Sequence, residues 1–206
     1  GNNKEAWTAF EKSIEYDPIA FEAWYNLGVV AESMGDSNKA LGYYDKALEL
    51  QENHLLTLVN VGNLLMHDRQ FGKSAEYYQK ALAVTEDDFK ANYNFGLLKL
   101  ATKDFSGAQL FFEQACRSEP SEMIAWNQYI RASMQLQDFT NALQAADVVL
   151  GVTPNSPFAL SIAAIASAEL KDDVNAEQFM ARLKEVNIER WQKLVDSNAT
   201  LRALVQ

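Results

Sequence analysis

Few residues in this 206-residue chain have the type and spacing that catalysis or metal binding requires. The two histidines, His54 and His67, have no second histidine, cysteine or suitably spaced carboxylate beside them. Cys116 is the single cysteine, which excludes an intrachain disulfide and a cysteine-based metal site. The glycines form neither a phosphate-binding loop nor a nucleophile elbow. We therefore predict that the chain is not an enzyme and binds no metal or cofactor.

One set of polar side chains does have a regular spacing, since Asn26, Asn60 and Asn94 follow one another at 34 residues. An asparagine amide both donates and accepts hydrogen bonds, which suits it to the main chain of another polypeptide. Asparagine is also a common residue on solvated surfaces. Two interpretations stay open at this point, a ladder that binds a peptide and a polar face that binds nothing.

The same 34-residue step connects residues of other types. Gly28, Gly62 and Gly96 follow it inside stretches rich in helix formers. Glycine within a helix costs about 0.5–1 kcal/mol relative to alanine, so its recurrence indicates a close contact that excludes a side chain. Further series on this step are the small residues Ala6, Ala40, Ser74, Ala108, Ala142 and Ala176, the aromatic residues Phe10, Tyr44, Tyr78 and Phe112, and the prolines Pro18, Pro120 and Pro154.

Each 34-residue period has the pattern of two helices joined by a turn. The apolar residues between Trp24 and Ala31 recur with helical spacing, and a second helical run follows a few residues later. Between them, Gly35 suits the left-handed residue that ends a helix, and Asp36 or Ser37 suits the next N-cap. The sequence therefore predicts an all-α chain of helical pairs.

This pattern resembles the tetratricopeptide repeat, with a large residue at place 4, Leu at 7, Gly at 8, Ala at 20, an aromatic residue at 24, Ala at 27 and Pro at 32. The resemblance implies a right-handed α-solenoid in a single domain, 1–206, with five repeats between an N-terminal half repeat and a C-terminal helical cap. The half repeat is 1–20, the repeats are 21–54, 55–88, 89–122, 123–156 and 157–190, and the cap is 191–206.

The match weakens toward the C-terminus, as terminal repeats are expected to be atypical. Ile130 and Ala164 replace the glycine, and Ala146 replaces the aromatic residue of place 24. Within the cap we expect a helix to start at Asp196 or Ser197.

The half repeat carries Trp7, Phe10 and Ile14 without the helix that would pair with it. We therefore expect that the sequence is a fragment of a longer protein. The uncovered apolar side chains leave self-association through this end as an open alternative.

In the family that the chain resembles, places 2, 5, 6, 9 and 13 of each first helix line a concave groove that binds peptides. The resemblance therefore assigns as candidate peptide-binding residues Asn26, Asn60, Asn63, Asn94, Tyr25, Tyr93, Lys90, Asn127 and Arg131. Lys90 and Arg131 would be available to an acidic group. Further along, Phe158, Ile162 and Ile165 either extend the groove or, as we expect, are covered by the cap.

The predicted function is that of an interaction scaffold that binds a peptide or a helix of a partner protein. Two alternatives are the substrate-selecting arm of a larger enzyme, such as a glycosyltransferase, and an assembly or secretion factor of a bacterial envelope. The net charge of −10 argues against a nucleic-acid partner, and no apolar run suits membrane insertion. The compartment stays open, with the cytoplasm favoured.

Overall fold

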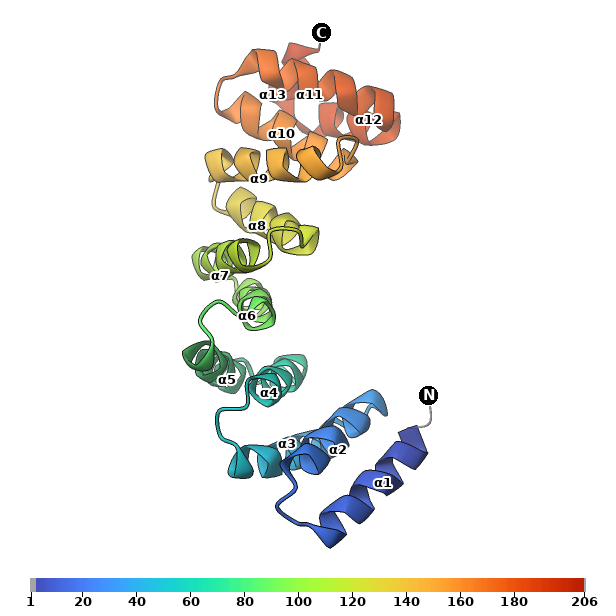
Figure 1. The fold of residues 1–206 in the computed structure, drawn as a ribbon. Helices are drawn as coiled ribbons and strands as arrows, with labels where there is room; N and C mark the ends of the chain where they lie inside the picture. Colours follow the sequence, from blue (N-terminus) through green and yellow to red (C-terminus); the bar gives the residue numbers. More distant parts are fainter. Residues whose placement is uncertain (1–2, 206) are drawn as a thin grey trace. The chain divides into compact units, whose positions relative to one another are not determined.

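The structure, a computed structural model, describes residues 3–205, which form thirteen helices and no strand (Figure 1). The prediction of an all-α chain is thus confirmed. The helices are α1 (Asn3–Tyr16), α2 (Phe21–Ser33), α3 (Ser37–Leu50), α4 (Leu55–His67), α5 (Phe71–Val84), α6 (Phe89–Ala101), α7 (Phe105–Ser118), α8 (Met123–Gln135), α9 (Phe139–Val152), α10 (Pro157–Glu169), α11 (Asp173–Val186), α12 (Ile188–Ser197) and α13 (Ala199–Leu204).

The chain divides after Leu98 into two compact units. In the first unit, α2 packs against α3 and α4 packs against α5. In the second unit, α8 packs against α9 and α10 packs against α11. These are helical pairs that the 34-residue pattern predicts. By their place in the pattern, we call α2, α4, α6, α8 and α10 first helices and α3, α5, α7, α9 and α11 second helices.

The turn inside each pair uses the backbone conformation that the sequence predicts. Gly35 has a φ of 80°, in the left-handed region that glycine enters without steric cost. The corresponding residues of the later pairs are not glycine but have φ between 58° and 64°: Arg69, Lys103, Gln137 and Lys171. For residues with a Cβ this conformation costs roughly 1–2 kcal/mol, so the repeat geometry overrides local preference at four turns.

The residue after each of these turns caps the second helix. The Asp36 carboxylate accepts a hydrogen bond from the backbone N–H of Lys39 at 3.1 Å, as predicted for this place. Asp104, Asp138 and Asp172 cap α7, α9 and α11 in the same way. Gln70, at the start of α5, makes no side-chain cap hydrogen bond.

The recurrent glycines lie where an aromatic ring of the second helix meets the first helix. A Cβ on Gly28 would lie 2.4 Å from ring atoms of Tyr44, and one on Gly62 would lie 2.7 Å from the ring of Tyr78. Both tyrosines are fully buried. The close contact that the glycine series predicts is therefore present in the first two repeats.

The two C-terminal repeats fill these two places with other residues. In the fourth repeat, Ile130 stands at the glycine place and Ala146 at the aromatic place, and both are fully buried. The fifth repeat has Ala164 and Met180 there, again buried. A larger residue on the first helix thus accompanies a smaller or flexible one on the second, which keeps the interior filled.

At the N-terminus, α1 has no buried residue. Ala6 is half-buried, whereas the five residues on the same 34-residue step from Ala40 to Ala176 are fully buried. Trp7 nevertheless has a partner within the chain, because its ring packs edge-on against Tyr43 at 5.5 Å between centroids.

The C-terminal end is closed by the two short helices α12 and α13. The expected helix start at Asp196 or Ser197 is wrong, because α12 continues to Ser197 and the next helix starts at Ala199. Asn198 provides the cap instead, because its side-chain oxygen accepts a hydrogen bond from the backbone N–H of Leu201 at 3.0 Å. Asn187 caps α12 in the same manner, so the last predicted repeat, 157–190, ends inside α12.

The cap packs on the fifth repeat through apolar side chains. Ile165 belongs to the same cluster as Trp191, Leu194 and Leu204, as expected if the cap covers it. Phe158 is contacted differently, because the guanidinium groups of Arg131 and Arg190 lie 5.8 and 5.9 Å from its ring centroid.

The glycine contacts give a stability prediction. Gly62→Ala should destabilise the chain by about 1–3 kcal/mol, because the added carbon overlaps the buried ring of Tyr78. Gly42→Ala is the control, since Gly42 is exposed in α3 and a Cβ there meets nothing within 4 Å. It should be neutral or stabilise by up to about 1 kcal/mol. Urea unfolding followed by circular dichroism compares them, and equal stabilities would contradict the proposed contact.

The left-handed turns give a second prediction. Gln137→Gly should stabilise the chain by about 1 kcal/mol, because it relieves the steric cost of φ 58° at that residue. Gly35→Ala should act in the opposite direction at the corresponding turn, where φ is 80°. The midpoint of thermal unfolding measures both changes, and a lower midpoint for Gln137→Gly would refute the interpretation.

Candidate functional site

The nine candidate residues all lie on first helices. α2 carries Tyr25 and Asn26, α4 carries Asn60 and Asn63, α6 carries Lys90, Tyr93 and Asn94, and α8 carries Asn127 and Arg131. The first seven belong to the first unit, and Asn127 and Arg131 belong to the second. We call the seven residues of the first unit the first-helix surface.

Asn60 is held by a hydrogen-bonded chain that starts in the preceding repeat. The hydroxyl of Tyr44 donates to the Glu32 carboxylate at 2.9 Å, and the Asn60 side-chain amide donates to the Tyr44 hydroxyl at 3.1 Å. Burial, followed by the bond to Glu32, raises the pKa of Tyr44 well above its ordinary value, so the hydroxyl keeps its proton. Asn60 remains half-buried, and one N–H and the carbonyl oxygen of its amide are not used in this chain.

Asn63 is held by the second tyrosine of the series. The Tyr78 hydroxyl donates to the Asn63 side-chain oxygen at 2.7 Å, and burial raises the pKa of Tyr78. This contact occupies one lone pair of the amide oxygen and leaves both amide N–H groups for other acceptors. Two candidate side chains are therefore oriented by tyrosines whose rings form the core.

Tyr25 belongs to an aromatic cluster at the edge of the first-helix surface. Its ring centroid lies 6.2 Å from that of Phe21, 6.0 Å from that of Tyr44 and 5.2 Å from that of His54. His54 is also the N-cap of α4, where its Nδ1 accepts from the N–H of Thr57 at 3.3 Å. Because Tyr44 contacts both Tyr25 and Asn60, the structure links these two candidate residues.

The candidate residues of α6 differ in exposure. The Tyr93 ring stacks on Phe89 with 5.7 Å between centroids. Lys90 is exposed, whereas Asn94 is half-buried, as is Asn26 at the corresponding place of α2. The first-helix surface thus combines half-buried asparagine amides with the exposed ammonium group of Lys90.

In the second unit, the two candidate residues have different surroundings. The side-chain oxygen of Asn127 is buried and has no hydrogen-bond partner among the described residues. Arg131 is exposed and stands over the ring of Phe158. Its guanidinium therefore already has one favourable contact within the chain.

Tyr44, Tyr78 and Glu32 were not expected at this surface, because the repeat pattern places the two tyrosines in the core. Their rings are in the core, but their hydroxyl groups reach the asparagines. The signal was the choice of tyrosine rather than phenylalanine at two of the aromatic places, since a buried tyrosine usually has a hydrogen-bond partner.

Other reactive groups are dispersed. Burial raises the pKa of the Cys116 thiol to about 12, which leaves it protonated and unreactive at neutral pH. Among the residues described, no three His, Cys, Asp or Glu side chains gather in a way that could hold a metal ion. Within the same residues, no helix has the length and apolar character needed to cross a membrane.

Comparison with protein families agrees with this architecture. Three profiles described as tetratricopeptide repeat match residues 21–54, 57–91 and 93–159. The chain belongs to the tetratricopeptide-repeat family. No protein with a curated description matches it in a sequence comparison.

Solved structures with the same fold include YrrB, described as a TPR protein with an unusual peptide-binding site. YrrB matches with a TM-score of 0.78 at 19% identity, over 96% of this chain and 98% of its own. The pilF protein of Pseudomonas aeruginosa matches with a TM-score of 0.73 at 19% identity, over 96% and 91% of the two chains. MamA matches with a TM-score of 0.70 at 16% identity, over 84% and 94%. These likenesses confirm the predicted tetratricopeptide fold.

The cap formed by His54 predicts a pH dependence. Burial lowers the pKa of His54 in the folded chain, so the unfolded chain binds the proton more readily. The stabilisation by neutral His54 is complete above its unfolded pKa of about 6.5 and is lost as pH falls through the lower folded value. Unfolding free energies measured between pH 7.5 and 5 should therefore decline more in the wild type than in His54→Asn, which keeps a cap acceptor that does not titrate.

His67→Asn serves as the matched control for this measurement, because His67 is exposed and lies at the opposite end of α4. It should decline in parallel with the wild type. If the unfolding free energy of His54→Asn also declined in parallel with that of the wild type, protonation of His54 would not contribute to the pH dependence of stability.

Proposed function

We propose that this chain is an interaction scaffold that binds an extended peptide segment or a helix of a partner protein on its first-helix surface, and that binding is its whole activity. The observation that supports this most is the fixed orientation of Asn60 and Asn63 by buried tyrosine hydroxyls. Amides that are already oriented lose little conformational freedom when a ligand arrives, which favours affinity.

The chemistry of the surface suits polypeptide main chain. After its bond to Tyr44, Asn60 can still donate one hydrogen bond and accept others, and Asn63 can still donate two. An extended peptide presents alternating N–H and C=O groups that need such partners when they leave water. Exposed Lys90 adds an attraction for an acidic side chain, and Tyr25 and Tyr93 supply aromatic contact area.

The alternatives of a substrate-selecting arm of a larger enzyme and of an envelope assembly factor use the same surface in another context. In either case the first-helix surface would bind the substrate or the partner protein. The likeness to pilF concerns the fold at 19% identity, and it gives neither alternative an advantage over an independent scaffold.

The test begins by identifying the partner at the surface itself. A photo-cross-linking residue, p-benzoylphenylalanine, replaces Asn94 on α6 or, as the control, Gln79, which is exposed on α5. Mass spectrometry then compares what each version captures from cells of the source organism. A protein captured at the first site and not at the second is the partner to titrate.

Changing Asn60 and Asn94 together to Ala should then lower the affinity for that partner at least about tenfold. Each lost amide leaves a main-chain group of the bound segment unpaired, which costs about 1–3 kcal/mol, and 1.4 kcal/mol corresponds to a factor of ten. Asn38→Ala with Gln79→Ala is the control, since both residues are exposed on second helices. Isothermal titration calorimetry measures both, alongside melting temperatures.

Unchanged affinity in the folded Asn60→Ala/Asn94→Ala variant would reject the first-helix surface as the binding site. Because Asn60 also bonds Tyr44, a small drop in melting temperature is expected, and circular dichroism at the titration temperature establishes that the variant is folded.

A further inference from the structure

The fourth repeat lacks an aromatic ring that every other full repeat has. Place 23, on the second helix, is aromatic in four repeats, where it is occupied by Tyr43, Tyr77, Phe111 and Phe179. In the fourth repeat this place is Ala145. Beside Ala145 the structure has a pocket of about 240 Å³ between α7, α8 and α9, all within the second unit.

The first repeat shows the surroundings of the place-23 ring when that ring is present. Trp24 and Trp126 stand at the same place of their repeats, and each indole N–H donates to a proline carbonyl, Pro18 at 2.8 Å and Pro120 at 2.9 Å. The ring of Tyr43 lies 6.0 Å from that of Trp24. In the fourth repeat, Trp126 lines the pocket instead.

The polar neighbours of the two positions also correspond. Burial raises the pKa of Tyr43, and the nearby Glu11 carboxylate raises it further while Lys39 lowers it. Three periods, or 102 residues, after Glu11 and Lys39 the chain has Glu113 and Asn141. Both of these residues line the pocket. The pocket therefore has neighbours that correspond to those of the Tyr43 ring in the first repeat.

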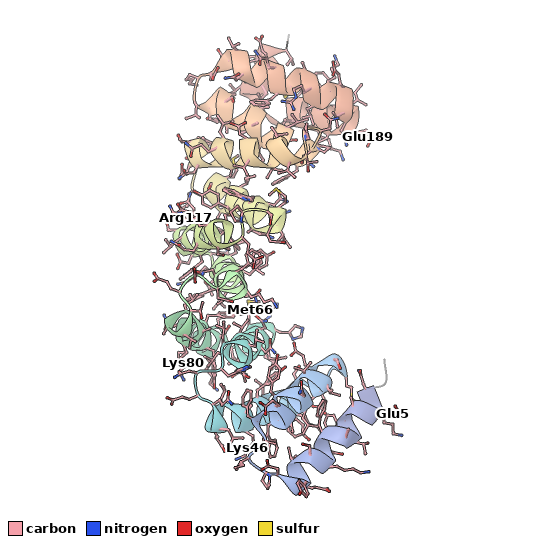
Figure 2. The ribbon with its side chains drawn as sticks, viewed as in Figure 1. Glu5, Lys46, Met66, Lys80, Arg117 and Glu189 are labelled. Carbon is pink, nitrogen blue, oxygen red and sulfur yellow. The ribbon has the colours of Figure 1, made fainter. Side chains whose placement is uncertain are left out.

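The floor of the pocket is buried and uncharged. Cys116 is 1% exposed, Tyr129 7% and Ala145 1%. Burial raises the pKa values of both Cys116 and Tyr129 to about 12, so neither carries charge at neutral pH. A polar rim surrounds this floor, where Arg117 forms an ion pair with Glu113 at 2.5 Å; Arg117 is labelled on α7 in Figure 2.

We propose that this pocket, which we call the α7–α9 pocket, receives an aromatic side chain from a partner polypeptide, with the ring on the apolar floor and a tyrosine-type hydroxyl at the polar rim. An apolar cavity of about 150 Å³ suffices to bind a benzene ring, and aromatic anchors in such pockets are typical of protein interfaces. The α7–α9 pocket is separate from the first-helix surface, so this inference does not rest on the proposed function.

The experiment titrates three probes into the isotopically labelled chain and follows amide signals by nuclear magnetic resonance. The probes are 4-methylphenol, N-acetyl-tyrosinamide and N-acetyl-leucinamide. We expect saturable shifts at Cys116, Tyr129 and Ala145 with the two aromatic probes, and binding of the leucine probe about fivefold weaker, because the pocket matches a ring.

Ala145→Phe should abolish these shifts and raise the melting temperature, since it supplies the missing ring from within the repeat. Ala145→Leu is the second variant, for use if Ala145→Phe does not fold. Its smaller side chain fills part of the pocket and should weaken binding of the aromatic probes. Ala181→Phe, at an exposed place of α11, is the control and should bind the probes as the wild type does.

Any of the following results would overturn the proposal. The first is the absence of saturable shifts in the wild type. The second is binding that persists in Ala145→Phe or that is equal for the leucine and tyrosine probes. The third is binding of 4-methylphenol without N-acetyl-tyrosinamide, because a ring attached to main chain could then not enter. Since none of these involves Asn60 or Asn94, failure here is distinguishable from failure of the first-helix surface.

Discussion

The approach of an aromatic ring to a helix backbone at Gly28 and again at Gly62 is the contact on which the rest of the structure depends. With a Cβ at either position, the rings of Tyr44 and Tyr78 could not occupy their sites. These rings fill the interior of the helical pair, and their hydroxyl groups emerge at the neighbouring first helix, where they orient Asn60 and Asn63. One steric requirement therefore sets both the spacing of the helices and the geometry of the candidate surface.

The contact is repeated in altered form rather than copied along the chain. In the fourth repeat Ile130 fills the same interior from the first helix, opposite Ala146, and in the fifth repeat Met180 fills it from the second helix, opposite Ala164. This exchange conserves volume at place 24, as a packed interior demands. At place 23 of the fourth repeat no such exchange occurs, and the α7–α9 pocket beside Ala145 is the result.

The fold could be predicted from the sequence because its packing repeats at fixed intervals. The glycine at 28, the turn at Gly35 and the cap at Asp36 all follow from local sterics and hydrogen bonding, and the structure confirms them. The helix start at Ala199, capped by Asn198, was missed because Asp196, Ser197 and Asn198 are all good caps. The choice among them depends on how Leu201 packs against the fifth repeat.

The surface was less predictable than the fold. A residue's place in the repeat locates it on a first helix, which is how Asn60 and Asn94 were selected. The hydrogen bond between neighbouring repeats from Asn60 to Tyr44 depends on the reach of both side chains, and the pattern of apolar residues does not encode that reach. A cavity is even more difficult to predict from the sequence, because the pocket beside Ala145 depends on the packing of all the side chains around it.

The start of α5 has a consequence for the dynamics of the chain. α3, α7, α9 and α11 begin with an aspartate whose carboxylate satisfies a backbone N–H, but Gln70 provides no such bond. The following turn contains exposed Gly72, which adds conformational freedom to the unfolded segment. Among the second helices, fraying therefore begins most easily at the N-terminal turn of α5, whose amide protons exchange with solvent ahead of those at the start of α3, α7, α9 and α11.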